Sequence, residues 1–396
     1  MGRPSPAVFF PLNSLPTIRL GIVGTGFIAS GFHALAAARK DLRVAAVLTR
    51  RPLNEVRGPQ AEALTRSIDE LVEKSDLVVE CSGSVRHAAE VVAAAQAAGR
   101  PVVTMNSEFH VTVGSFFVSK GLLTEAEGDQ PGSIAALAEE AIAMGFEPKI
   151  LGNTKGFLNL APTREEMEYW AGRQGISLEQ VTAFTDGTKV QIEQAFVANG
   201  LGGTIARQGL AGPRAGTLAE AIETLEPLAS AHPCCIADYV LTPQWPGSVF
   251  VSATHPSADP AALRYLKMGE GPLYTLVKPY HLCFLEMAKT LRRAFDERRE
   301  LLHNSAAPRV SVLAIAKKDL RAGAAIAKGI GSFDLRGEAA LIAENPDHVP
   351  IGLLEDAILR QPVEAGQVLT WKDVDVPDSL ALRAWQSIRS QVLAGA

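Results

Sequence analysis

The sequence between residues 18 and 29 reads IRLGIVGTGFIA. A short apolar run leads directly into Gly24 and Gly26, and the small residue Ala29 follows. A dinucleotide-binding turn needs glycine where the strand turns sharply, glycine where the pyrophosphate approaches the backbone, and a small residue where the helix packs on the strand. The stretch therefore predicts the first strand, turn and helix of a Rossmann domain.

Short apolar runs alternate with helical segments through the first third of the chain. The predicted strands are Ile18 to Val23, Arg43 to Leu48, Asp76 to Cys81 and Pro101 to Met105, and an alanine-rich helix from Arg86 to Ala98 joins the last two. Alternation of this kind is typical of βαβ units with right-handed crossovers. We therefore expect an α/β fold built on a doubly wound parallel sheet.

The expected cofactor residues follow the ends of these strands. The pyrophosphate of a dinucleotide is expected at the N-terminus of the helix that begins at Phe27, because free N–H groups and the helix dipole favour an anion there. The predicted cofactor-binding residues are Gly24, Thr25, Gly26, Phe27, Ile28, Arg50, Arg51, Ser82, Gly83 and Asn106.

The end of the second strand bears on the choice between NADP and NAD. An NAD enzyme places an acidic residue about 20 positions after the fingerprint, where it holds the ribose hydroxyls. Residues 48–51 read LTRR instead, and two guanidinium groups can bind a 2′-phosphate and stack on adenine. The sequence therefore favours NADP(H), with NAD as the alternative. The other interpretation of Arg50 and Arg51 is a solvated loop.

The length of 396 residues predicts two or three domains. We expect a Rossmann domain over 1–128 completed by a helix over 283–303, an α+β domain for substrate binding and oligomerisation over 129–282, and a small β-rich domain over 308–396. None of the fingerprint lies beyond residue 307. If the last domain only covers or oligomerises the enzyme, a chain that ends near Ala307 should still bind NADPH, whereas loss of all soluble protein would mean that this domain completes a shared core.

The bulk composition excludes several classes of protein. A formal net charge of −5 gives no footprint for nucleic acid or an anionic membrane surface, and no apolar run approaches the ~20 residues of a membrane span. The four cysteines show neither zinc-ligand spacing nor a disulfide framework. We expect a cytoplasmic homo-oligomer that acts on a small molecule and binds neither nucleic acid nor membranes.

Polar residues also stand where apolar packing would be expected, in MNSE at 105–108, GNTK at 152–155 and DGTK at 186–189. Ligands of open α/β sheets lie beyond the carboxyl ends of strands, and on a helix from Gly187 the side chains of Lys189 and Glu193 share a face. For that pair the alternative is a surface salt bridge worth little. The candidate catalytic residues are Lys189, Lys155, Asp186, Glu193, Glu108 and Asp129.

Several motifs together carry a family resemblance. They are GIVGTGF at 21–27, MNSE at 105–108, GDQPG at 128–132, GNTKG at 152–156, DGTK at 186–189, KMGEGPLY at 267–274 and PYHL at 279–282. With them the chain resembles the homoserine dehydrogenase-like NAD(P)-dependent oxidoreductases that carry a C-terminal SAF domain. This group includes the 1-deoxy-D-xylulose 5-phosphate reductoisomerase-like family. Two similar stretches, 313–323 and 358–370, each read as a strand with a polar turn closing on glycine and resemble the SAF module.

The leading hypothesis is an NADPH-dependent oxidoreductase, either a simple one or a reductoisomerase, acting on a small polyol or sugar derivative with or without a phosphate. Lys155 or Lys189 would stabilise the growing alkoxide or give it a proton. A divalent cation would help a rearrangement, and the oxygen ligands on offer are Asp129, Asp186, Glu108 and Glu193. The alternatives are a homoserine-type hydroxy or amino acid dehydrogenase, and a non-catalytic cofactor-binding sensor or scaffold whose SAF domain binds carbohydrate.

Overall fold

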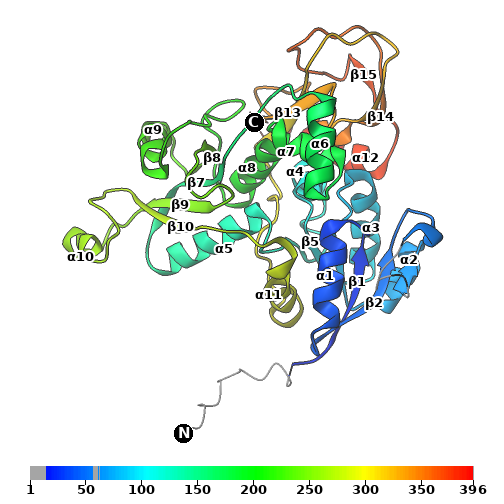
Figure 1. The fold of residues 1–396 in the computed structure, drawn as a ribbon, viewed down its shortest axis with the longest axis horizontal. Coiled ribbons are helices and arrows are strands. Elements are labelled where there is room, and N and C mark those ends of the chain that lie inside the picture. The colour runs from blue at the N-terminus through cyan, green and yellow to red at the C-terminus, as the bar shows by residue number, and fades with distance from the viewer. Residues whose placement is uncertain (1–14, 57–60, 62, 396) are drawn as a thin grey trace.

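The computed structural model describes residues 15–56, 61 and 63–395. Its first part is a six-stranded parallel sheet with the order β3-β2-β1-β4-β5-β6 (Figure 1). The strands are β1 Ile18–Val23, β2 Leu42–Leu48, β3 Leu64–Thr65, β4 Leu77–Glu80, β5 Val102–Thr104 and β6 Leu123–Glu125. This is the doubly wound order, so the predicted Rossmann sheet is confirmed. The sequence did not predict β3 and β6, which are only two and three residues long.

Helices cover both faces of this sheet. They are α1 Phe27–Ala37, α2 Ile68–Lys74, α3 Val85–Ala97 and α4 Ser107–Val113, with short 3-10 turns at η2 Leu53–Glu55 and η4 Gly114–Phe116. Successive strand residues point to opposite faces. Ile22 therefore packs in the core with α1, and Val23 packs in the core with α3.

The predicted helix over 283–303 is wrong in length. The chain forms a 3-10 turn η5 Cys283–Leu285, the helix α11 Met287–Arg292 and a π-helical turn η6 Arg293–Glu297. Arg298 then adopts φ of 53°, which ends the helix. The backbone N–H of Glu125 donates to the Leu302 carbonyl at 2.8 Å, so the segment that follows runs along the edge of the sheet. The expected packing on the Rossmann core is present, through Met287 and Leu291.

A second, four-stranded mixed sheet has the order β10-β9-β7-β8. Its elements are α5 Gln130–Ala143, β7 Glu147–Lys155, α6 Arg164–Gln174, α7 Leu178–Thr185, α8 Thr188–Gly200, α9 Leu218–Ser230, β8 Ile236–Leu241, β9 Val249–Thr254, α10 Pro260–Tyr265 and β10 Tyr274–Lys278. Ile150 of β7 packs against α9, while Leu151 lies in the core that includes α5. The two helices therefore cover opposite faces.

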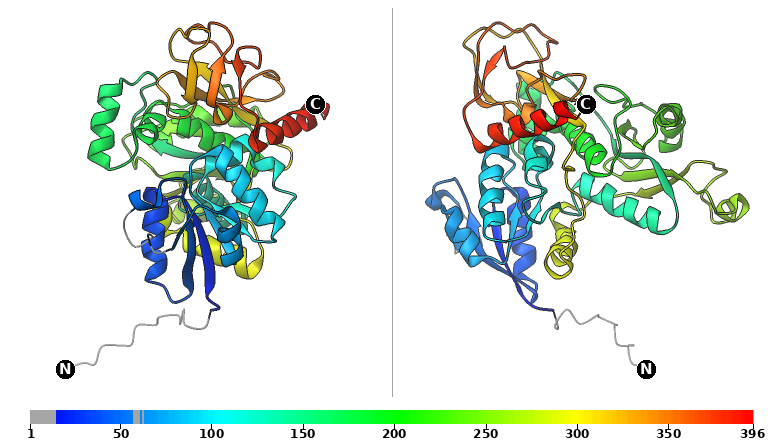
Figure 2. Two further views of the ribbon diagram at one scale, coloured as in Figure 1. Left: turned by 90° about the vertical axis from the view of Figure 1, so that its right-hand side faces the viewer. Right: turned by 180° about the vertical axis from the view of Figure 1, so that it is seen from behind.

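The last part of the chain is β-rich, as expected. Its elements are β11 Val310–Ala316, β12 Ala325–Lys328, β13 Leu335–Leu341, the 3-10 turn η7 Ile351–Leu353, β14 Glu355–Leu359, β15 Val374–Asp375 and α12 Leu380–Ala394. They form the antiparallel sheets β11-β13 and β12-β14-β15. Helix α12 lies against α3 and α4 of the Rossmann part (Figure 2). None of the helices in the described residues is long and apolar enough to cross a membrane.

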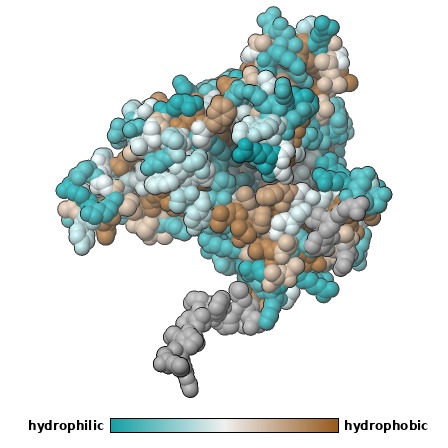
Figure 3. Space-filling model, in the orientation of Figure 1, coloured by the Kyte–Doolittle hydropathy of each residue, from teal (hydrophilic) through white to brown (hydrophobic). Residues whose placement is uncertain are grey.

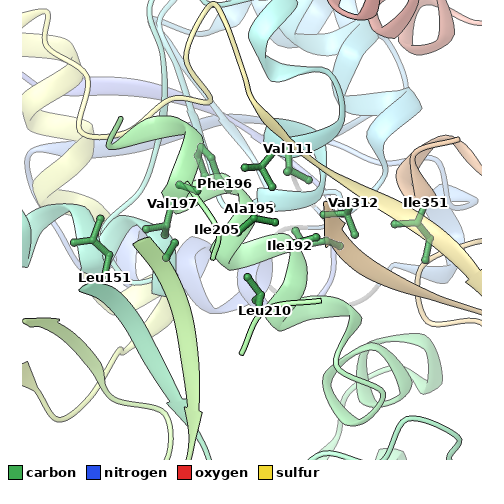
Figure 4. Close-up of a cluster of buried hydrophobic side chains, with 14 of the residues drawn as sticks. Val111, Leu151, Ile192, Ala195, Phe196, Val197, Ile205, Leu210, Val312 and Ile351 are labelled. Atoms are coloured by element: carbon green, nitrogen blue, oxygen red, sulfur yellow. The ribbon is translucent and has the colours of Figure 1, made fainter. Parts of the chain in front are cut away.

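Helix α8 lies where the three parts meet. Its buried side chains share one core with α4, β7 and β11 (Figure 4). The residues labelled there are Val111, Leu151, Ile192, Ala195, Phe196, Val197, Ile205, Leu210, Val312 and Ile351. Because Val111 belongs to the Rossmann part and Val312 to the last part, this core joins the three parts of the chain, and the Rossmann sheet and the second sheet each have a further core of their own.

Trp385 of α12 tests this sharing, because it is 1% exposed and packs in a core of the Rossmann part. Trp385→Ala should lower the free energy of unfolding by about 3–5 kcal/mol, since it deletes a large buried side chain. Trp385→Phe should cost clearly less, because the buried indole N–H has no hydrogen-bond partner among the described residues. Urea unfolding measures both. A loss below about 1 kcal/mol for the alanine variant would contradict the shared core.

Candidate active site

One cleft of about 1050 Å³ joins the Rossmann part, the second sheet and the C-terminal part. The fingerprint turn and the loop after β4 form one end, and polar residues of α5, β7 and α8 form the other. Residues 328–330 and 351–355 add a wall from the C-terminal part. The space-filling view shows apolar side chains gathered near the middle of this face, at the level of α1 and α11 (Figure 3).

The fingerprint turn has the shape that a pyrophosphate needs. Gly24 has φ of +108°, and a Cβ there would lie 2.9 Å from the Cys81 carbonyl oxygen. A Cβ on Gly26 would meet nothing within 4 Å, so the backbone is open to the cleft at this position. Helix α1 begins after Gly26 without a side-chain cap, which leaves its first N–H groups free for an anion. These residues fit a dinucleotide.

The expected adenosine end holds Arg50 and Arg51, and both line the cleft. The side chain of Arg50 is 57% exposed, and its Nη1 lies 3.9 Å from Oε1 of Glu355. His87 of α3 lines the same end. Burial and the nearby guanidinium of Arg50 lower the pKa of His87 to about 4, so its ring is neutral near pH 7. Arg50 and Arg51 are therefore positive charges that line this end of the cleft, and Lys328 of β12 lines the cleft as well.

The other end of the cleft holds two lysines, each paired with a carboxylate. Lys189 Nζ lies 2.8 Å from Glu108 Oε1 and donates to Ser107 Oγ at 2.8 Å. Lys155 Nζ lies 2.9 Å from Glu193 Oε2. The Lys189 side chain is 12% exposed and the Glu193 side chain 3%. The alternative of a surface salt bridge between Lys189 and Glu193 is therefore wrong, because both are buried and each has another partner.

Two amides hold the Lys155 pair in place. Asn153 Nδ2 donates to Glu193 Oε2 and to Gln130 Oε1, at 2.8 Å each. Lys155 also donates to Gln130 Oε1. Asn153 was part of a predicted polar stretch, but Gln130 was not predicted, because nothing in its local sequence points to residues 23 and 25 positions away.

The carboxylates around Lys189 stabilise the protonated form of its side chain. Burial alone would lower the pKa of this ammonium, but the carboxylates of Glu108, Asp129 and Glu193 outweigh it and hold the pKa above its usual range. Lys189 is therefore a fixed cation at neutral pH and a donor to an oxygen in the cleft. A fixed cation can stabilise negative charge that develops during a reaction.

Asp129 lies beside this cation as the N-cap of α5. Burial would raise the pKa of its carboxyl, but the charge of Lys189 and the contact with Glu125 hold it below its usual range. Burial, followed by the charge of Asp129, raises the pKa of Glu125 well above its usual range. Burial and the charge of Asp129 therefore favour the protonated form of Glu125, and Thr104 Oγ1 donates to its Oε2.

His110 completes this buried layer below the cleft. Its Nε2 lies 2.8 Å from Thr104 Oγ1, and its ring stacks on Phe196 of α8 at 4.5 Å. Burial lowers the pKa of His110 to about 3. Since Thr104 donates its proton to Glu125, we assign the Nε2–H tautomer to the neutral ring.

All but two of the predicted site residues line the cleft. Asp186 instead lies under Lys317 at 2.6 Å, with its side chain 0% exposed, and accepts from the Thr188 N–H at 2.8 Å. Asn106 is fully buried, caps α4 and donates to Glu80 Oε2 at 2.7 Å. The contacts of both side chains stabilise the fold next to the site. They do not support the catalytic role predicted for Asp186 or the cofactor-binding role predicted for Asn106.

The four carboxylates proposed as oxygen ligands do not form one group. Glu108 and Glu193 are taken by lysines, and Asp186 by Lys317. Within the described residues, no set of three or more His, Cys, Asp or Glu side chains has the arrangement of a metal site.

Two family models match consecutive parts of the chain. Residues 24–112 match a model described as homoserine dehydrogenase, NAD binding domain, and residues 128–287 match a model described as oxidoreductase DRL, catalytic domain. A search of curated proteins gives no match. With the open glycine turn and the polar cluster in one cleft, these matches define the chain as an NAD(P)-dependent oxidoreductase.

Solved structures show only a distant likeness. A putative myo-inositol dehydrogenase from Sinorhizobium meliloti is 16% identical with a TM-score of 0.40, and covers 72% of this chain and 91% of its own. A UDP-N-acetylglucosamine 3-dehydrogenase from Acidithiobacillus ferrooxidans is 12% identical with a TM-score of 0.42, and covers 73% of this chain and 93% of its own. Likeness at this level identifies no reaction or substrate.

Lys189→Met tests the role of the fixed cation. The change keeps most of the aliphatic stem and removes the charge, so turnover should fall about 10²- to 10³-fold while the cofactor affinity changes little. Steady-state kinetics and cofactor fluorescence measure the two effects. Lys149→Met is the matched control, because this lysine of β7 is 44% exposed, does not line the cleft and forms its ion pair with Glu147 among the described residues. Turnover within a few-fold of the parent would transfer the role to Lys155.

His110 gives a pH prediction for stability. Its pKa is about 3 in the folded chain and near 6.5 when unfolded. Between these values the unfolded chain binds more protons, so the free energy of unfolding falls as the pH drops from about 6.5 toward 3. His110→Gln removes this titration and should make the dependence shallower by up to about 1.4 kcal/mol per pH unit. Urea unfolding from pH 7.5 to 4.5 measures it, and parallel curves would contradict a neutral His110.

Proposed function

We propose that this chain transfers hydride between NADPH and a small sugar or polyol derivative. The observation that carries the proposal is the single cleft in which an open glycine turn and a lysine-carboxylate cluster face each other. A polar cluster of this kind in a cleft is more often catalytic than structural.

The bound nicotinamide supplies or accepts the hydride. The chain's own residues would act on the oxygen of the reacting carbon. Lys189 donates a hydrogen bond to this oxygen and stabilises its negative charge as the carbonyl is reduced. Lys155 lies in the same cluster and donates the proton that converts the alkoxide to a hydroxyl group, and in the opposite direction it takes that proton back. In the opposite direction, the same groups stabilise the alkoxide from which hydride leaves.

The lining of the cleft supports a polyhydroxylated substrate. In the described residues, the arginines that line the cleft are Arg50 and Arg51, both at the cofactor end. Lys328 of β12 also lines the cleft and lies opposite Glu355 in the β12-β14 ladder. At the polar cluster itself, a substrate carboxylate would have to share Lys155 or Lys189 with a carboxylate already bound to it. Hydroxyl groups can instead donate to Glu193 and accept from the lysines. This favours a sugar or polyol over a homoserine-type amino acid.

In a second form of this proposal the chain is a reductoisomerase, which rearranges the carbon skeleton of the substrate before reducing it. Rearrangement before reduction needs two neighbouring substrate oxygens to be polarised together. The two ammonium groups of the cluster are the candidates for this task. Product analysis by NMR distinguishes the forms, since only rearrangement changes the carbon skeleton.

The experiment is a substrate screen with purified protein. Ketoses, aldoses and their phosphates are tested with NADPH, and polyols and homoserine with NADP. We expect turnover of sugars or polyols that Lys189→Met abolishes and Lys149→Met retains. Turnover of homoserine above that of every sugar and polyol would overturn the proposal.

The cofactor preference has its own prediction. Arg50→Gln should weaken NADPH binding about tenfold or more and change NADH binding less than about twofold, because the guanidinium contacts only the extra phosphate. Fluorescence titration with both cofactors measures the two affinities. Arg43→Gln on β2, the strand before Arg50, is the control, because Arg43 is exposed and does not line the cleft. Equal losses for both cofactors would reject the assignment of Arg50.

A further inference from the structure

The carboxylate that an NAD enzyme places at the end of its second strand is missing from residues 48–51. The structure brings another carboxylate to this place from the C-terminal part. Glu355, the first residue of β14, lines the cleft. Its Oε1 lies 3.9 Å from Arg50 Nη1, and its Oε2 accepts from Ser84 Oγ at 3.3 Å.

The backbone of Glu355 is fixed. It pairs with Lys328 of β12 in an antiparallel ladder. Arg86 of α3 donates to the Glu355 carbonyl at 3.4 Å and to Asp356 Oδ2 at 3.1 Å. Leu354, the preceding residue, is 1% exposed. The carboxylate is therefore held at the cleft by a strand and by the Rossmann helix α3.

The charge of Glu355 opposes that of Arg50. The side chain of Glu355 is 22% exposed, so the pair is only partly screened by water. A 2′-phosphate bound to Arg50 would lie close to this carboxylate and would compete with it for the guanidinium. A 2′-hydroxyl carries no charge and can donate a hydrogen bond to the same carboxylate. Glu355 therefore repels the 2′-phosphate of NADPH, whereas it can accept a hydrogen bond from the 2′-hydroxyl of NADH.

We propose that Glu355 is a cofactor-specificity residue, by which the C-terminal part weakens the binding of NADPH relative to NADH. Arg50 attracts the extra phosphate and Glu355 opposes it, so the chain accepts both cofactors instead of excluding NADH. The inference rests on the proposed cofactor seat at Arg50. It gives the C-terminal part a role at the cofactor end, where its residues line the cleft.

Glu355→Gln in the full chain tests the proposal. The amide still accepts from Ser84 and from a ribose hydroxyl, but it no longer repels a phosphate. Removing one like charge at about this distance should tighten NADPH binding on the order of tenfold and change NADH binding less than about threefold. Fluorescence titration gives both dissociation constants, and thermal unfolding checks that the variant is folded.

Asp356→Asn is the matched control. Asp356 is the next residue of β14, is 71% exposed and pairs with Arg86, and it does not line the cleft. Its φ is 56°, a conformation that asparagine adopts readily. The control removes the same charge from the same strand, so the ratio of the two affinities should stay within about twofold of the parent.

The outcomes separate this inference from the proposed function. No change in the NADPH to NADH ratio for Glu355→Gln, or equal weakening of both cofactors, would overturn the role of Glu355. If Arg50→Gln weakens NADPH binding while Glu355→Gln leaves the ratio unchanged, the seat at Arg50 stands and the role of Glu355 is wrong. If Arg50→Gln leaves NADPH binding unchanged, the seat at Arg50 is wrong, and so is the inference that rests on it.

Discussion

Helix α8 is buried on almost every side, and it nevertheless carries Lys189 and Glu193. An ammonium or carboxylate removed from water is strongly destabilising unless an opposite charge is in contact with it. The partners come from other elements: Glu108 from α4 of the Rossmann part and Lys155 from β7 of the second sheet. The relative positions of α4, β7 and α8 are therefore set by these ion pairs, and the geometry of the cleft is set with them.

The C-terminal part is attached to the same helix. Lys317, the residue that follows β11, pairs with Asp186 just before α8 begins. Thr188 Oγ1 accepts from the Gly337 N–H, and Gln191 Oε1 accepts from the Ala339 N–H, at 2.9 Å each. These bonds lie along one side of α8 and connect it to β13. The part of the chain farthest from the fingerprint in sequence thus supports the helix that carries the catalytic candidate.

The sequence predicted features that depend on short stretches of chain. The strand, turn and helix around Gly24 are decided within a dozen residues, so their boundaries were predicted well. The segment after Cys283 keeps a helical pattern, yet it leaves the helix at Arg298 to reach the edge of β6, because a tertiary contact overrides the local preference. The helical spacing likewise paired Lys189 with Glu193, whereas folding brings it to Glu108 from 81 positions away. Nothing in the sequence near Glu355 predicted its place at the cofactor end of the cleft, because its contacts there are with Arg50 and Ser84, which are far away in the sequence.

The two ends of the cleft handle charge differently. At the cofactor end, Arg50 is 57% exposed and only loosely paired, so a phosphate can bind it without breaking a short ion pair. At the reaction end, Lys189 is already bound to Glu108 and faces Asp129 as well. A permanent anion would have to compete with these carboxylates in the ground state. An alkoxide acquires its charge only during hydride transfer, next to an ammonium that is already oriented and needs no reorganisation. Lysines that are already paired therefore stabilise a reacting group that is neutral in the ground state and becomes charged in the transition state. For this physical reason we infer that the cluster acts on a carbonyl or hydroxyl group and not on an acid.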